Sequence, residues 1–445
     1  MKNVQITNNT AVFCSIVRPT RLARAMALVS LPLLVLGSSV VSAQDTDLQQ
    51  LRQQVEMLEQ KLTDMESRAP VLQEDNSYLL RDGKGIKIGD TTLSISGFVK
   101  LDVVAGSNGN GSRNGYAIGI PRNLAGFAKS DQNDWKTGFS ARETRLGIGS
   151  KTVNVAGHDL TTYIEMDFNT GIDEGGNEVV SNSYNPRLRL AYGSWNGFDF
   201  GQAYTTFTDL AALPEILDQG KQAAFIYSRQ PLVRYNLAVP GGKLMMSVEN
   251  PEDGFGSTSY DDQSYPDIAA RYQIRNDFGI YSLAGIVRNL EDNTADETTL
   301  TGAVSLSARI PTIGKDDLRL QYSYGALGRY MGLLSYPDFN REELANGNVE
   351  PLKTYGATAA YRHFWTPQWR STLSLSHTEI ADDINSAAST LSYFDSATSV
   401  HANLLWSAHE KLTLGLEYAY WNFGVIDSSS NEQYQQVMAS AKLSF

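Results

Sequence analysis

The sequence predicts an all-β fold, a sixteen-stranded antiparallel transmembrane β-barrel that follows a short N-terminal coiled-coil helix. Only strand-like patterns occur from residue 92 onward. Tight turns and long polar loops alternate between these patterns, as they do in outer-membrane barrels. The last pattern, 433–445, alternates with a strict period of two and ends on Phe445. A final strand that runs to the last residue is expected where closure of a barrel pairs it on both edges.

The N-terminal 43 residues have the features of a signal peptide. Basic residues at Arg18, Arg21 and Arg24 precede an apolar stretch, and Ala43 ends a run of small residues before Gln44. A retained membrane anchor is the alternative, which the short apolar stretch disfavours. The single cysteine of the chain lies inside this segment, so the mature protein has no disulfide and no cysteine chemistry.

A heptad pattern occupies residues 44–69 and predicts a periplasmic coiled coil. Its apolar seam has spacings of three and four residues. The seam residues are Leu48, Leu51, Val55, Leu58, Leu62 and Met65. One amphipathic helix packed on a domain is the alternative. Residues 70–91 form a linker, and 92–445 form the barrel domain.

The barrel strands are expected to be about as long as the 9–11 residues that a tilted spanning strand requires, or longer. The sixteen predicted strands are 92–105, 138–151, 156–169, 184–196, 197–205, 228–238, 242–250, 265–276, 277–289, 298–310, 316–327, 352–364, 367–380, 397–408, 409–422 and 433–445. The N-terminus then lies on the short-turn, periplasmic side.

Apolar and polar residues alternate along most of these strands. In 298–310, Leu300, Val304 and Leu306 share one face, and Ser305 and Arg309 share the other. An apolar face with aromatic residues near the strand ends is typical of lipid contact. The polar faces are therefore expected to line a water-filled lumen.

Arginines recur on the predicted lumen faces. An arginine on the lipid face near mid-depth costs about 2–4 kcal/mol, so these side chains must point inward. A wall of guanidinium groups attracts anions and offers bidentate contacts to carboxylate or phosphate. The alternative is that they pair with lumen acids such as Glu165, Asp167 and Glu417 and stiffen the wall. The candidate pore-lining and substrate-binding residues are Arg145, Arg187, Arg189, Arg234, Arg271, Arg275, Arg309, Arg319 and Arg362.

The loop 206–227 is too apolar for a loop exposed to water. It carries a short helix signal, with Asp209 as N-cap and Gly220 as C-cap. Folding into the barrel would bury its apolar residues and narrow the pore, and packing on a neighbouring subunit is the alternative. Glu215, Asp218 and Lys221 are the candidate constriction residues.

The sequence contains no recognisable catalytic or metal-binding motif. The five histidines lie apart from any serine and acid in a hydrolase arrangement, and no phosphate-binding loop or zinc motif occurs. The formal net charge of −12 excludes a basic nucleic-acid footprint for the whole chain. We therefore expect no enzyme activity, no cofactor, no metal and no nucleic acid partner.

Several segments resemble the DcaP-like outer-membrane porins, and the resemblance covers most of residues 45–445. These segments are Ser96-Gly97-Phe98-Val99-Lys100-Leu101-Asp102, Arg142-Glu143-Thr144-Arg145-Leu146, Tyr163-Ile164-Glu165-Met166-Asp167-Phe168, Arg187-Leu188-Arg189, Gly201-Gln202-Ala203-Tyr204-Thr205-Thr206-Phe207 and Arg229-Gln230-Pro231.

The resemblance implies a homotrimer in the outer membrane, a periplasmic coiled coil and passive uptake of small anionic solutes such as dicarboxylates. It also implies that the barrel assembly machinery reads the strand that ends in Phe445. Outer-membrane lipids and lipopolysaccharide are the expected surroundings. A phosphate-selective or general porin is the next reading, and a cell-wall anchoring barrel or an outer-membrane hydrolase is a weaker one. The dominance of arginine over lysine in the strands favours carboxylates.

Overall fold

The computed structural model describes residues 85–107, 135–169, 182–218, 222–252, 264–292, 297–331, 336, 338–339, 350–382, 394–425 and 431–445. The predicted signal peptide, the coiled-coil seam from Leu48 to Met65 and most of the linker lie outside these residues. Lys221 and Gly220 of the predicted inward loop also lie outside them.

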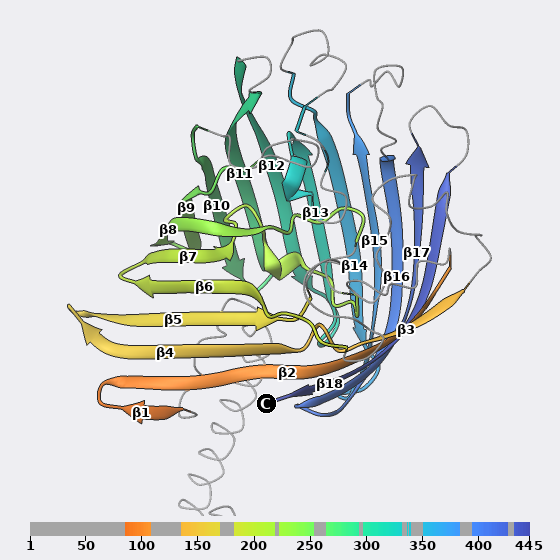
Figure 1. Ribbon diagram of the computed structural model, residues 1–445, viewed down its shortest axis with the longest axis horizontal. Helices are drawn as coiled ribbons and strands as arrows, with labels where there is room; N and C mark the ends of the chain where they lie inside the picture. Colours follow the sequence, from red (N-terminus) through yellow and green to blue (C-terminus); the bar gives the residue numbers. More distant parts are fainter. Residues whose placement is uncertain are drawn as a thin grey trace, which may run out of the picture. The chain divides into compact units, whose positions relative to one another are not determined.

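Eighteen strands form one antiparallel sheet (Figure 1). They are β1 (Ile86–Ile88), β2 (Thr91–Gly106), β3 (Lys136–Ser140), β4 (Arg145–Val155), β5 (His158–Asp167), β6 (Arg187–Trp195), β7 (Phe198–Tyr204), β8 (Arg229–Val239), β9 (Gly242–Glu249), β10 (Asp267–Asn276), β11 (Gly279–Asp292), β12 (Glu297–Pro311), β13 (Asp317–Gly325), β14 (Thr354–Phe364), β15 (Trp369–Ile380), β16 (Phe394–His409), β17 (Leu412–Val425) and β18 (Glu432–Ser444).

The sheet closes into a barrel because its last strand pairs with its first long one. β18 runs antiparallel to β2, with Gln436 opposite Gly106 and Ser444 opposite Phe98. β3 and β4 share one place in the wall beside β2, and β1 only extends the edge of β2. Sixteen strand positions therefore complete the wall, which confirms the predicted fold class.

The interruption between β3 and β4 divides the predicted strand 138–151 into two. Consecutive residues of a regular strand point to opposite faces, yet Arg142 and Glu143 are both buried. The break allows both charged side chains to avoid the outer surface. Glu143 then forms an ion pair with Lys100 of β2.

Burial alternates along the strands as the sequence predicts. In β12, Val304 and Leu306 are about half exposed, while Ser305 and Arg309 are buried. In β18, Val437 and Leu443 are exposed and Met438 is buried. The outer surface of the barrel is therefore an apolar band, which suits contact with lipid chains.

Aromatic residues gather where the strands reach the short turns. Trp365 and Phe278 are exposed beside their turns, and Trp369 stacks on Trp406 with a centroid distance of 5.7 Å. Aromatic rings at this level mark the membrane–water interface of outer-membrane barrels.

Candidate pore and its charged lining

The described residues of the connection between β7 and β8, 205–218 and 222–228, lie inside the barrel (Figure 1). Wall side chains hold its backbone from several strands. The N–H groups of Ala223, Ala224 and Ile226 donate to Ser399 Oγ (2.9 Å), Ser376 Oγ (2.8 Å) and Gln321 Oε1 (3.0 Å) respectively. These acceptors belong to β16, β15 and β13, so the connection, here called the inward loop, follows the inner wall.

Glu417 of β17 is a second anchor of the inward loop. Its carboxylate is fully buried and accepts the backbone N–H groups of Leu217 (2.7 Å) and Asp218 (3.3 Å). It also accepts from Asn403 Nδ2 at 3.1 Å, and His401 Nδ1 lies 3.4 Å from it. The described partners of Glu417 are thus the loop and its β16 neighbours rather than the predicted arginines.

The described residues of the inward loop contain one short 3-10 turn, Leu210–Ala212, in place of a longer helix. Asp209 caps the turn as predicted, accepting the N–H of Ala211 at 3.0 Å. Pro214 excludes the helical conformation for the residue before it, and Leu213 is extended with φ −65° and ψ 121°. The helix signal read from the sequence was therefore wrong beyond this turn.

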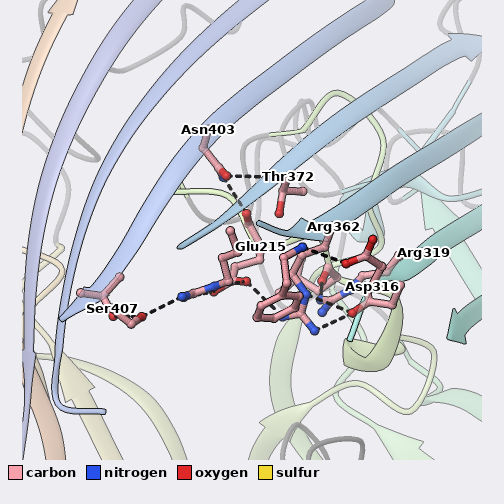
Figure 2. Close-up of polar contacts among 12 residues, drawn as sticks. Glu215, Asp316, Arg319, Arg362, Thr372, Asn403 and Ser407 are labelled. Atoms are coloured by element: carbon pink, nitrogen blue, oxygen red, sulfur yellow. Dashed lines mark hydrogen bonds and ion pairs between the residues drawn. The ribbon is translucent and has the colours of Figure 1, made fainter. Parts of the chain in front are cut away.

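Glu215 sits at the point where the inward loop meets β14 and β15. Arg370 Nη2 and Nε donate to its carboxylate at 2.6 and 2.9 Å. Arg362 Nη1 donates to it at 3.0 Å (Figure 2). The backbone carbonyl of Glu215 accepts from Asn403 Nδ2 at 2.7 Å. Burial raises the pKa of Glu215, but hydrogen bonds and charge from the two arginines outweigh burial and hold its pKa at about 2. Glu215 is therefore ionised at neutral pH.

Of the other two predicted constriction residues, Asp218 is among the described residues and Lys221 is not. Asp218 is buried and accepts from Gln436 Nε2 of β18 at 3.0 Å. Asp218 thus contacts β17 and β18, whereas Glu215 contacts β14 and β15.

Three of the predicted arginines meet around Asp317, at the start of β13. Arg319 Nε donates to Asp317 Oδ1 at 2.6 Å, Arg362 Nε donates to Oδ2 at 3.0 Å, and Arg309 lies 3.4 Å from Oδ2. Arg319 also donates to the carbonyl oxygen of Leu213 in the inward loop. Three guanidinium groups thus share one carboxylate at this end of the loop.

Three more predicted arginines lie together on β4 and β6. Arg189 donates to Glu165 at 2.6 Å and to Asp167 at 2.9 Å, and Arg187 donates to Asp167 at 2.7 Å. Arg145 lies 3.8 Å from Glu165. In this group the acids named in the sequence analysis do pair with the arginines.

The remaining predicted arginines are separate from both groups. Arg234 pairs with Asp199 at 2.8 Å, and Arg271 lies 3.5 Å from Asp209 of the inward loop. Arg275 is half-buried near the end of β10, beside the turn to β11.

A cavity of about 620 Å³ lies between the inward loop and wall residues of β2, β4, β5, β7, β13 and β15 to β18. One side is apolar, where Leu213, Pro214 and Ile216 of the loop face it. The charged lining is mostly basic. Its basic residues are Lys100, Arg145, Arg319, Arg370, Lys411 and Lys442, and its acidic residues are Glu143, Glu165 and Glu215.

The candidate pore residues did not include four buried or lining cations. Arg370 and Lys442 share the parity of polar neighbours on their strands, so the alternation of the sequence places both on the inner face. Lys100 has an ion pair with Asp102 at 3.2 Å. Arg288 is buried between Asp267 and Asp338, and its apolar strand neighbours conceal its inward position in the sequence.

A second connection, between β13 and β14, also contacts the inward loop. Its 3-10 turn Gly328–Tyr330 is followed by Met331, which pairs with Ile226 in an isolated bridge. Tyr227 N–H donates to the carbonyl of Tyr330 at 3.2 Å. Together the two connections bury a cluster of apolar side chains inside the barrel, including Phe207 and Leu327.

Among the described residues, no helix combines the length and the apolar character needed to cross a bilayer.

Solved structures with a similar fold are outer-membrane proteins. The outer membrane channel DcaP of Acinetobacter baumannii has a TM-score of 0.70 and 21% sequence identity, over 81% of this chain and 100% of that one. An anion-selective porin from Comamonas acidovorans has a TM-score of 0.51 and 13% identity, over 80% and 100%. Salmonella typhi OmpF has a TM-score of 0.53 and 13% identity, over 81% and 99%.

No curated protein sequence matches the chain. The sequence model of one family, the DcaP outer membrane proteins, matches residues 36–432, which is most of the chain. This match agrees with the closed barrel, its apolar outer band and its charged interior. The chain belongs to the DcaP outer membrane protein family.

Proposed function

We propose that this porin passes small organic anions, with dicarboxylates and related acids as the preferred class. The observation that carries the proposal is the charge of the cavity beside the inward loop, where six basic side chains face three acidic ones. A confined cavity with an excess of one charge raises the local concentration of the opposite ion. Guanidinium groups add bidentate contacts that suit carboxylates.

A preference for anions would distinguish this function from that of a general porin. Planar-bilayer recordings across a KCl gradient should give a reversal potential that favours chloride over potassium. Liposome swelling with succinate, phosphate and a neutral sugar of similar size then ranks the solutes. Cation preference would overturn the proposal, and faster phosphate than succinate entry would favour the phosphate-selective alternative.

We propose further that the assembly follows the family plan outside the described residues. A signal peptide over 1–43, a periplasmic coiled coil over 44–69 and a linker over 70–91 precede the barrel. The coiled coil supports a homotrimer within lipid and lipopolysaccharide, and Phe445 serves recognition by the barrel assembly machinery. Conductance in three equal steps and a trimeric mass in detergent are the expected results.

A further inference from the structure

We propose that Arg370 and Arg362 form a carboxylate subsite of the pore in which Glu215 sits as an internal ligand, and that a carboxylate in transit exchanges with Glu215. The inference rests on the proposed anion uptake and names a specific site for it. It assigns to Glu215 a part in selecting the solute, beyond that of a constriction residue.

The geometry at Glu215 is that of a bound carboxylate ligand. Arg370 presents Nε and Nη2 to both carboxylate oxygens, at 2.6–3.0 Å, and Arg362 Nη1 adds a third donor at 3.0 Å. Such fork-like contacts are the strongest and most specific that arginine makes with carboxylates. A solute carboxylate placed here would find the same donors.

The subsite is accessible to a solute. The side chains of Glu215 and Arg370 are 25% and 15% exposed, and both line the cavity. Arg370 has one further described contact, from Nη1 to Ser407 Oγ at 2.7 Å, which fixes the plane of the guanidinium group. Glu215 is the only described carboxylate within ion-pair distance of Arg370.

Glu215, the internal ligand, belongs to the inward loop and not to a strand of the wall. Glu215 is carried by the inward loop, whose backbone on either side is held by other groups, at Leu213 by Arg319 and at Leu217 by Glu417. The carboxylate can therefore leave Arg370 while the loop stays attached. A tethered ligand competes with free solutes at a high effective concentration, in the millimolar range for short tethers.

Two neighbouring features favour a carboxylate on a short aliphatic stem over an inorganic anion. Leu213, Pro214 and Leu405 line the same cavity and offer apolar surface beside the arginines. Lys442 also lines it, and its ammonium lies 4.6 Å from the centre of the Phe98 ring. Among the described residues, Lys442 makes no ion pair with an acid, so it can attract a second negative group.

The test measures the concentration of propionate that half-saturates the propionate current in planar bilayers. Propionate reproduces the carboxylate and stem of a glutamate side chain. Glu215→Gln keeps the size of the side chain and removes the competing charge, so the half-saturating concentration should fall about tenfold. Asp199→Asn is the matched control, because it neutralises an acid paired with Arg234 inside the barrel and outside the cavity lining.

A double variant separates competition from loosening of the loop. If Glu215 competes for Arg370, the gain must vanish in Glu215→Gln combined with Arg370→Gln. A gain that persists in the double variant, an equal gain in Asp199→Asn, or an unchanged Glu215→Gln would each overturn the subsite. The reversal potential of the unaltered protein in KCl decides anion uptake separately, so the two proposals fail on different measurements.

Discussion

Some charged residues inside the barrel are paired with residues of opposite charge, and others are not. Arg189 is almost fully buried and is held by two acids, Glu165 and Asp167, so its charge is offset where it stands. Breaking such a buried pair typically costs about 3–5 kcal/mol, because an uncompensated charge remains. Residues of this kind stabilise the wall. The charge of a cavity residue such as Lys442 is offset less by nearby acids than that of Arg189, so it acts more strongly on an ion in the cavity.

Lys442 therefore offers a clean prediction at the residue scale. Lys442→Gln removes one positive charge from the cavity without leaving a buried acid unpaired, since its described close contact is with the Phe98 ring. The permeability ratio of chloride to potassium should fall about two- to threefold, as expected when a confined field weakens. Reversal potentials in a KCl gradient measure the ratio.

Lys151→Gln is the control for this variant. Lys151 pairs with Asp159 at 3.0 Å near the β4–β5 turn and does not line the cavity. Its reversal potential should match that of the unaltered protein. Equal ratios in both variants would show that Lys442 has no influence on the permeating ions.

At the scale of elements, the inward loop depends on wall acceptors for its position. Glu417 receives two backbone N–H groups of the loop in a buried site, and each buried donor that loses its partner costs about 1–3 kcal/mol. We predict that Glu417→Ala releases the segment around Leu217. Single-channel conductance should rise, and the open-channel current should become noisier.

Glu379→Ala separates the loss of the anchor from the loss of a charge. Glu379 lies on β15 and contacts Tyr355 and His377, away from the inward loop. Its removal changes the barrel charge by the same amount. An equal rise in conductance in Glu379→Ala would mean that charge, and not the anchor, controls the opening.

The sequence predicted the strands well, but not the irregularities in their pairing. Period-two alternation predicted all sixteen strands and the inward phase of Arg319 and Arg309, because lipid on one side and water on the other enforce the pattern. The alternation did not predict two irregularities of the sheet. The break before β4 and the register shift in the pairing of β5 with β6 depend on packing across strands. The shift leaves Leu190 buried beside Arg189, where alternation had placed it outside.

The candidate site was predicted less completely than the fold. Alternation placed the candidate arginines on the inner face, but the candidates did not include Arg288 or Arg370. The apolar character of the inward loop indicated that it must be buried. The partners of Glu215 depend on where a loop from one side of the barrel meets β14 and β15. Contacts between residues 147 and 155 positions apart leave no local pattern in the sequence.

At the scale of the whole molecule, the net charge and the pore charge have opposite signs. The chain carries a formal net charge of −12, while the cavity lining is mostly basic. Selectivity should therefore come from the confined lining and not from the total charge. A field of this kind is screened by salt, with a Debye length of about 10 Å at 0.1 M and about 3 Å at 1 M.

We predict that anion preference weakens as the ionic strength increases. The permeability ratio of chloride to potassium should be highest below 0.1 M KCl and approach one near 1 M. Reversal potentials at a fixed concentration gradient and several mean concentrations provide the measurement. A ratio that does not change with salt would indicate that close contacts, and not the field of the lining, select the ion.

The contacts of the inward loop also constrain the order of assembly. The loop precedes in sequence nearly all the strands that hold it, and Asp218 reaches Gln436, 218 positions further along the chain. Contacts between such distant residues form late in folding, because long stretches of chain must be ordered first. The inward loop can therefore take its final position only when β16, β17 and β18 are in place. Closure of β18 on β2 then encloses a segment synthesised much earlier, so the barrel wall and the position of the inward loop are expected to be completed together.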